Sequence, residues 1–198
     1  MISKINKNRT AIFMDSSNVY HSMKNIGWEI DWKKLIDYFS KEVNLINANF
    51  YMVEKKPLSE ECVKLQSVLR KNGYKIKKKD LKEIYCSESN KKQYKGNMDI
   101  ELAIDAIKSI ETYDTCILFS GDGDFVPLVE YLEARNKVVK VISSIKKRTA
   151  IELIDAVGMN HISIESLRPY IERIAKKNRN SNSRAVSYTH LTLPTTPY

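Results

Sequence analysis

Cysteine and histidine are scarce in this sequence, which removes several common kinds of site. The chain has three cysteines, Cys62, Cys86 and Cys116, and no two of them have CxxC spacing. An odd number without that spacing argues against a disulfide framework and a zinc knuckle, so we expect reduced, buried thiols. With only three histidines in the chain, an imidazole-rich metal site is disfavoured as well.

Long apolar runs are also missing. No run reaches the roughly 18 to 20 residues that cross a bilayer, and the N-terminus lacks the short apolar core of a secretory signal. We therefore expect a cytoplasmic protein with no membrane partner. Glycine and proline are few while lysine, isoleucine and asparagine are abundant, a bias that indicates an AT-rich bacterial genome more than a function.

The sequence does contain enough apolar residues for one core, together with a large excess of positive charge. Its 198 residues are 42% hydrophobic, which suits a single domain, placed at residues 1–177. Residues 178–198 have no pattern that could join a core, and we expect a disordered or vector-derived tail. The net charge of +9 favours a polyanionic partner such as nucleic acid.

Short apolar runs alternate with helical patterns along the domain. The runs typical of buried strands lie at 10–14, 49–53, 116–119 and 138–142, with weaker candidates at 73–79 and 161–164. Amphipathic patterns predict helices at 31–41, 59–71, 98–110, 125–134, 148–157 and 164–175. This alternation predicts an α/β fold, a three-layer αβα arrangement around a central parallel sheet. The polar connection 80–97 is expected to be a long loop.

Acidic residues stand where strands end or helices begin. Asp15 closes the first predicted strand, Asp122 and Asp124 follow the strand at 116–119, and Asp99 opens a helix. Ligands bind outside the carboxyl ends of parallel strands, where the strand order reverses. If the first strand lies beside 116–119, Asp15 and Asp122 face each other there. Each residue alone has a simpler explanation: a helix cap for Asp124, a first-turn dipole partner for Asp99, and a backbone turn for Asp15.

Such a group of carboxylates needs compensation. Two unneutralised carboxylates 4 Å apart repel by roughly 4 kcal/mol at an effective dielectric near 20, so protons, basic partners or a divalent cation must offset the charge. A cation is the most economical answer. Carboxylate oxygens with few histidines select hard ions, so the expected cofactor is Mg²⁺ or Mn²⁺. His21 lies near Asp15 in the sequence, but a surface or helix-packing role is favoured for it.

The glycines around Asp122 indicate a tight strand-to-helix turn, because Gly121 and Gly123 flank it. The segment is not a GxGxxG fingerprint, a Walker loop or an EF-hand. A haloacid-type phosphatase would need a second aspartate two residues after Asp15, where Ser17 stands instead.

Three motifs carry a resemblance to a known family. They are Ile12-Phe13-Met14-Asp15-Ser16-Ser17-Asn18, Lys95-Gly96-Asn97-Met98-Asp99 and Ser120-Gly121-Asp122-Gly123-Asp124-Phe125-Val126-Pro127-Leu128. With these motifs the chain resembles the NYN domains of the LabA-like group, relatives of the PIN-domain nucleases, over most of residues 10–165. The last motif is the most specific, and no matched carboxylate is missing.

The resemblance implies a PIN-like fold with Rossmann-like topology, and a metal-dependent endoribonuclease that hydrolyses the phosphodiester bonds of single-stranded or structured RNA. It implies that Asp15, Asp99, Asp122 and Asp124 hold one or two metal ions and form the catalytic set. Asn18 and Ser120 would position a carboxylate, water or phosphate. The products would carry 5′-phosphate and 3′-hydroxyl ends. Asp105, six residues beyond Asp99, is expected to be solvated or paired with Lys108.

Basic residues gather around the connection 80–97 and could bind RNA phosphates. We expect Lys79, Lys92 and Lys95 to contact substrate, although most charge runs are simply solvated. Tyr85 and Tyr94 could stack on bases or anchor the loop. The wider group is Lys75, Lys77, Lys78, Lys79, Lys82, Lys91, Lys92 and Lys95, with a second group at Lys146, Lys147 and Arg148.

Two other functions remain open from the sequence. One is a non-catalytic RNA-binding or regulatory NYN-domain protein, although a pure binder need not retain the full carboxylate set. The other is a partner protein that works through self-association, and a homodimer is left open.

Overall fold

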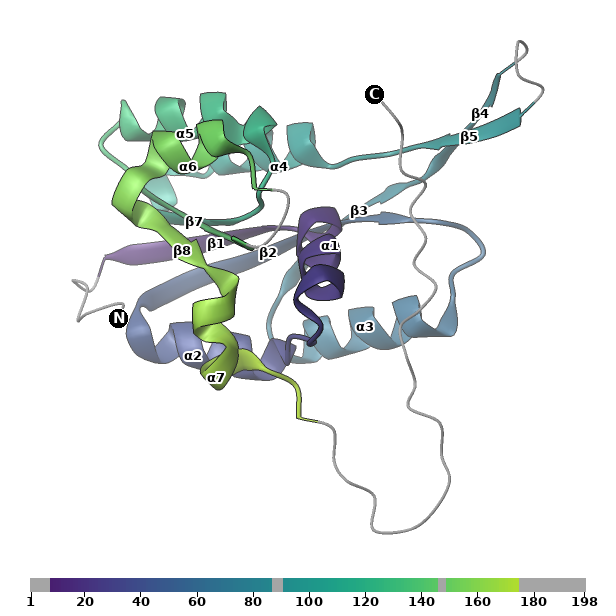
Figure 1. The fold of residues 1–198 in the computed structure, drawn as a ribbon, viewed down its shortest axis with the longest axis horizontal. Coiled ribbons are helices and arrows are strands. Elements are labelled where there is room, and N and C mark those ends of the chain that lie inside the picture. Colours follow the sequence, from purple (N-terminus) through teal and green to yellow (C-terminus); the bar gives the residue numbers. More distant parts are fainter. Residues whose placement is uncertain (1–7, 87–90, 146–148, 175–198) are drawn as a thin grey trace.

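A six-stranded parallel sheet forms the centre of the molecule (Figure 1). The computed structural model describes residues 8–86, 91–145 and 149–174. The strand order is β3-β2-β1-β6-β7-β8, and every neighbouring pair in this sheet is parallel. The strands are β1 (Arg9–Asp15), β2 (Asn44–Glu54), β3 (Lys75–Asp80), β6 (Thr115–Phe119), β7 (Val138–Ser143) and β8 (His161–Ser163).

Helices cover both faces of the sheet, as Figure 1 shows. One face carries α1 (Ser16–Ile26), α2 (Trp32–Glu42), α3 (Glu60–Lys71) and the short α7 (Arg168–Ile171). The other carries α4 (Asp99–Lys108), α5 (Val126–Glu133) and α6 (Ile151–Val157). Short 3₁₀ turns complete the connections: η1 (Ile110–Thr112), η2 (Gly123–Phe125), η3 (Gly158–Asn160) and η4 (Ile164–Leu167). The predicted three-layer αβα fold is confirmed.

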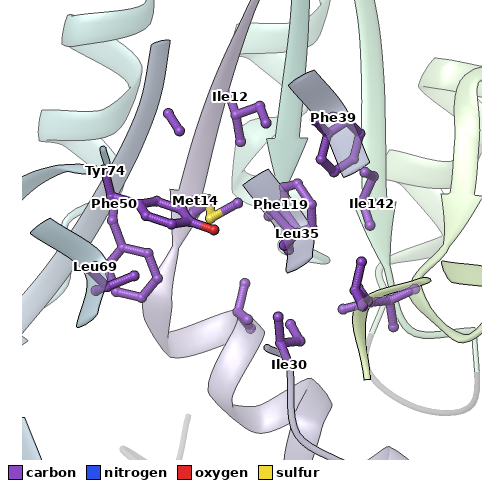
Figure 2. Close-up of a cluster of buried hydrophobic side chains, with 14 of the residues drawn as sticks. Ile12, Met14, Ile30, Leu35, Phe39, Phe50, Leu69, Tyr74, Phe119 and Ile142 are labelled. Atoms are coloured by element: carbon purple, nitrogen blue, oxygen red, sulfur yellow. The ribbon is translucent and has the colours of Figure 1, made fainter. Parts of the chain in front are cut away.

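Alternating side chains of the central strands supply two separate cores. In β1, Ile12 and Met14 point into the core under α1, α2 and α3, while Ala11 and Phe13 point into the core under α4, α5 and α6. Figure 2 shows the first core, where Leu35 and Phe39 of α2 pack among Met14, Phe119 and neighbouring apolar side chains. Buried strands with both faces covered read as continuous apolar runs, which is why these strands are visible in the sequence.

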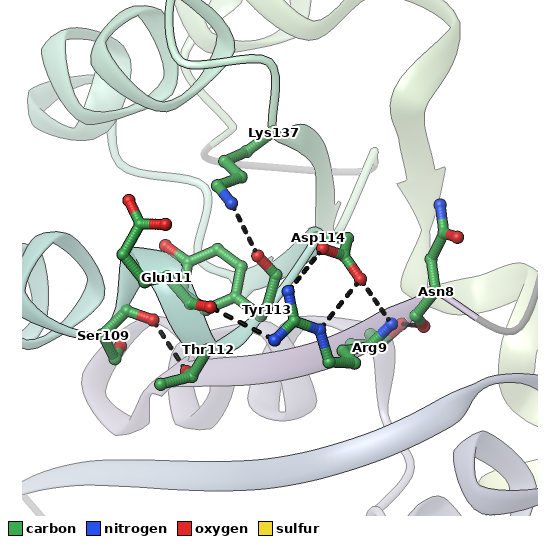
Figure 3. Close-up of polar contacts among 9 residues, drawn as sticks. Asn8, Arg9, Ser109, Glu111, Thr112, Tyr113, Asp114 and Lys137 are labelled. Carbon is green, nitrogen blue, oxygen red and sulfur yellow. Dashed lines mark hydrogen bonds and ion pairs between the residues drawn. The ribbon is translucent and has the colours of Figure 1, made fainter.

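The strand order reverses at β1, as expected if the first strand lay beside 116–119. Residues 10–14 of β1 pair in register with residues 115–119 of β6, and β2 lies on the other side of β1. At the opposite, amino-terminal edge, the guanidinium of Arg9 binds both carboxylate oxygens of Asp114, with Nη2–Oδ1 at 2.8 Å and Nε–Oδ2 at 3.2 Å (Figure 3). This contact joins the start of β1 to the start of β6.

Three sequence-based assignments were wrong. Residues 16–26, left without a helix, form α1, which is capped by Asp15 at its start and by Gly27 at φ 75° at its end. Connection 80–97 is not simply a loop, because β4 (Lys82–Cys86) and β5 (Lys91–Lys95) form an antiparallel hairpin that projects from the body in Figure 1. The final helix is broken into η4 and α7, and Glu172 is already extended.

Elsewhere the boundaries shift by a few residues, most of all in β2, which begins at Asn44. The predicted start of the helix at Arg148 and the predicted tail 178–198 lie outside the described residues. Among the helices that the structure describes, none is long and apolar enough to cross a membrane.

Core packing gives a direct test of the first core. Replacing Leu35, which is 0% exposed, by alanine should lower the free energy of unfolding by about 2–5 kcal/mol, because the substitution leaves a cavity. The matched change Leu58→Ala, at a position 38% exposed, should cost less than about 0.5 kcal/mol. Urea unfolding of both variants measures the difference. Equal losses would contradict the assigned burial.

Candidate active site

Asp15 is the last residue of β1 and the first fixed point of the site. Its carboxylate is only 7% exposed. Oδ1 accepts hydrogen bonds from the backbone N–H groups of Ser17 at 3.0 Å and Asn18 at 3.4 Å, so Asp15 caps α1. A hydrogen bond to nearby backbone, the simpler explanation for Asp15, therefore accounts for Oδ1. The other oxygen, Oδ2, is directed to Ser120 at the end of the neighbouring strand β6.

Ser120 and Asn18 connect β1 to the loop after β6. The hydroxyl of Ser120 donates to Asp15 Oδ2 at 3.3 Å and accepts from the N–H of Asp122 at 3.2 Å. The side-chain oxygen of Asn18 accepts from the N–H of Gly121 at 2.9 Å. Both residues therefore connect the carboxyl end of β1 to the loop after β6.

Asp122, not Asp124, is the capping residue of the turn that follows β6. Asp122 Oδ1 accepts from the N–H of Asp124 at 3.0 Å. Asp124 is exposed, and α5 begins without a side-chain cap. The alternative that Asp124 merely caps the helix after it is therefore wrong.

Asp99 reaches the same edge from the other layer. It is the first residue of α4, which packs against both β1 and η2. The amide of Asn97 donates to Asp99 Oδ2 at 2.6 Å. Burial, followed by the charges of Asp15, Asp122 and Asp124, raises the pKa of Asp99 to about 7. Asp15, Asp122 and Asp124 are therefore close enough to Asp99 for their charges to act on it.

The group carries negative charge that the described chain does not neutralise. Burial also raises the pKa of Asp15, against the opposing effect of its hydrogen bonds. No ion pair within the described residues involves any of the four aspartates. Over the same residues, no three Asp, Glu, His or Cys side chains converge as a ready metal-binding group. The donors are all hard carboxylate oxygens, which fit a magnesium-like ion and not zinc.

Two glycines in the matched motifs lie in close contact with neighbouring side chains. A Cβ on Gly123 would lie 3.0 Å from Cβ of Ala150, and one on Gly96 would lie 2.8 Å from Cγ1 of Val53. The sequence indicated only a turn at Gly123, whereas in the structure Ala150 also restricts the size of the side chain at this position. The loop bearing Asp122 and the segment at Ala150 are consequently in contact, and Ala150 N–H donates to Gly121 O at 2.9 Å.

Three of the four lysines of β3 are paired with acids. Lys79 Nζ lies 2.6 Å from Glu101 Oε1, two residues beyond Asp99, and Lys78 Nζ lies 3.0 Å from the buried Glu54. Lys77 Nζ lies 3.5 Å from Asp105 Oδ2.

The predicted partner of Asp105, Lys108, was wrong. Its side chain is about one-third exposed and is partnered not by Lys108 but by the hydroxyl of Tyr51, which donates a hydrogen bond at 3.0 Å, and by Lys77. Adjacent strands and α4 bring these groups together, and helical spacing alone does not reveal partners on a sheet.

Other predicted RNA contacts fall on parts of the chain without described side chains. Lys92 and Lys95 lie on β5, and their side chains are outside the described residues, as are those of Lys91, Tyr85 and Tyr94. Lys146, Lys147 and Arg148 are outside the described residues altogether.

A pocket of about 380 Å³ adjoins the acidic group, and sequence reasoning missed it. Its lining residues include Asn18, His21, Asn25, Asp122 and Thr149. His21 had been assigned a surface or packing role. The available signal was the spacing of Asn18, His21, Ser22 and Asn25, which places them on one face of a helix, but that helix itself was not recognised.

The raised pKa of Asp99 predicts how stability depends on pH. Without metal, folded Asp99 holds a proton until pH about 7, whereas its ordinary pKa is 3.8. The folded state therefore binds more protons between these values, and this residue makes stability fall as pH rises. Asp99→Asn should remove the effect and raise the free energy of unfolding at pH 8 by at least about 1 kcal/mol, allowing for solvent screening.

Urea titrations in EDTA between pH 4 and 8 measure this difference. The gain from Asp99→Asn should vanish near pH 4. Asp37→Asn, at an exposed site paired with Lys33, serves as the control and should show no such gain. Parallel stability curves for Asp99→Asn and the unsubstituted protein would rule out the assigned repulsion.

Comparison with known proteins identifies the family. The NYN domain profile matches residues 9–165. The chain is 35% identical to the low amplitude and bright protein LabA of Synechococcus elongatus, over 83% of this chain and 88% of the relative. A crystal structure of a protein of unknown function from Vibrio parahaemolyticus superposes with a TM-score of 0.69 at 27% identity, covering 84% of this chain and 98% of the other. The fold is PIN-like, and the chain belongs to the NYN domain family as a LabA-like member.

Proposed function

We propose that this protein is a metal-dependent endoribonuclease that hydrolyses phosphodiester bonds in RNA. The observation that carries the proposal is the gathering of Asp15, Asp99 and Asp122 from three separate elements, where burial and then the charges of Asp15, Asp122 and Asp124 raise the pKa of Asp99 to about 7. Structural residues do not need an arrangement that costs stability. Membership of the NYN family supports an RNA-related, nuclease-like role.

Asp15, Asp99, Asp122 and Asp124 are the proposed ligands of Mg²⁺ or Mn²⁺. Their side chains would have to rotate toward a common ion, since no three of the described carboxylates converge as placed. When bound, the cation supplies charge neutralisation at the phosphodiester and lowers the pKa of a water molecule. The unpaired charge of the four aspartates favours this occupant.

The neighbouring polar residues keep the carboxylates in place. Ser120 hydrogen-bonds to both Asp15 and the backbone of Asp122, which fixes the spacing of these two strand ends. Asn18 holds the start of α1 against Gly121. Asn97 orients the carboxylate of Asp99 through one oxygen. These contacts restrict side-chain freedom before any substrate binds, which reduces the entropic cost of assembling the site.

Lysines on the α4 side of the sheet are the proposed RNA contacts. Lys79 reaches Glu101 in the first turn of α4, so its ammonium lies near the helix that Asp99 begins. Lys92 and Lys95 belong to β5, the strand that leads into the Asp99 segment. Phosphates repelled by the aspartates require such cations nearby. Single-stranded RNA is the proposed substrate, because an unpaired chain can present its bases and phosphates to the protein.

A non-catalytic RNA-binding or regulatory protein is the second candidate. The observation in its favour is that no three carboxylates among the described residues form a ready ligand group. Against it stands the retention of all four aspartates, three of which lie close enough to Asp99 for their charges to act on it. Cleavage assays separate the two candidates.

The proposed catalytic role of Asp122 gives a clear expectation. With Mn²⁺ or Mg²⁺, the purified protein should cut a labelled single-stranded RNA to products with 5′-phosphate ends. Asp122→Asn should reduce the cleavage rate at least 100-fold, because a neutral amide is a poor ligand for a hard cation. RNA binding by this variant should persist. Gel analysis of products and fluorescence anisotropy provide the two measurements.

The control is Asp37→Asn, the same chemical change on α2, which should retain full activity. EDTA should stop cleavage by the unsubstituted protein. Cleavage that survives either EDTA or Asp122→Asn would refute the metal-dependent mechanism, and RNA binding without any cleavage would favour the second candidate.

A further inference from the structure

The pocket beside Asp122 lies between α1 and the segment 149–150. Asn18, His21, Ser22 and Asn25 follow one another at spacings of three, one and three residues, so they share one face of α1. Thr149 and Ala150 form the facing wall. The volume of about 380 Å³ lies within the range of small-ligand pockets, roughly 300–1,000 Å³.

The facing wall is held in place by the chain itself. Thr149 Oγ1 lies 2.9 Å from Ser143 Oγ and 2.6 Å from the carbonyl oxygen of Ser144. Ser143 in turn hydrogen-bonds to the ring of His161 at 2.8 Å. Ala150 is joined to Gly121 through the backbone. The pocket is therefore formed before any ligand enters.

The lining chemistry does not suit a phosphate. It includes no lysine or arginine among the described residues, and its one carboxylate, Asp122, repels anions. Backbone N–H groups in the glycine-containing loop are also engaged, because those of Gly121, Asp122 and Asp124 donate to Asn18, Ser120 and Asp122. The loop therefore cannot act as an anion-binding nest.

The same lining suits an uncharged group that is flat and polar. Asn25 offers both a donor and an acceptor at the exposed end of the face, and Ser22 offers a hydroxyl deeper in the pocket. His21 supplies a ring on which a base can stack. Bases splayed out of single-stranded RNA are recognised by this combination of stacking and edge hydrogen bonds.

We propose that this pocket binds one nucleoside of the RNA, next to the phosphodiester at the aspartate group. Its base lies against His21 and is hydrogen-bonded by Asn25. Placing this nucleoside beside the cleaved bond rests on the proposed ribonuclease function. Binding of a nucleoside to the pocket can be tested without cleavage. It makes an unpaired, flexible nucleotide the substrate element that the protein selects.

Neutral ligands test the pocket without the complication of phosphate repulsion. Adenosine and uridine, titrated into the isotope-labelled protein in EDTA, should shift the backbone amide resonances of residues 18–25 and 149–150. D-ribose, which lacks a base, should bind at least ten-fold more weakly. His21→Ala and Asn25→Ala should each weaken nucleoside binding about five-fold or more. Ser67→Ala, an exposed change on α3, should leave binding unchanged.

The outcomes separate the two proposals. Equal binding of ribose and nucleosides, shifts confined to other regions, or unchanged affinity in both pocket variants would overturn the nucleoside site. If adenosine binds as expected but RNA is never cut, the site stands and the ribonuclease proposal falls. If RNA is cut in an Asp122-dependent way while His21→Ala and Asn25→Ala leave KM unchanged, the ribonuclease proposal stands and the role of the pocket in substrate binding falls.

Discussion

The parallel pairing of β1 with β6 is the constraint on which the rest of this structure depends. Pairing of residues 10–14 with residues 115–119 brings the carboxyl ends of β1 and β6 side by side at one edge of the sheet. After β1 the chain enters α1 on one face of the sheet, and after β6 it leads to α5 on the other face. The resulting crevice explains why Asp15 and the loop of Asp122 meet although they are more than 100 positions apart, and why Ser120 can hydrogen-bond to both.

Burial disfavours the ionised form of the aspartates at this edge of the sheet. Asp15 is enclosed by the fold, and desolvation disfavours its ionised form, yet its hydrogen bonds favour that form. Asp99 accepts a hydrogen bond from the side chain of Asn97, and burial together with the charges of three other carboxylates disfavours its ionised form. Functional sites commonly keep such unfavourable arrangements, since perturbed pKa values follow from gathering like charges in a confined place.

The sequence predicted what depends on buried, periodic or chain-local features. Continuous apolar runs such as 10–14 and 116–119 identified the central strands, and strand-end aspartates identified the candidate site. Helix α1 was not predicted because only two of its residues, Val19 and Ser22, are buried, so its apolar stripe is weak. The β4–β5 hairpin was not predicted because it projects from the body and does not need the pattern of apolar residues that packs a strand against the core. The pairing of Asp105 with Tyr51 and Lys77 depends on contacts between elements, which spacing within one helix cannot reveal.

The lysines of β3 have a consequence for association between copies of the chain. Strand β3 is an edge strand, paired only with β2 within the described sheet, and such an edge presents unsatisfied backbone groups to any passing strand. Lys75, Lys77 and Lys78 lie along this strand and are exposed, although Lys77 and Lys78 also contact acids of the same chain. A second β3 brought alongside would place like charges opposite one another, so the same cations discourage the sheet from growing into an aggregate.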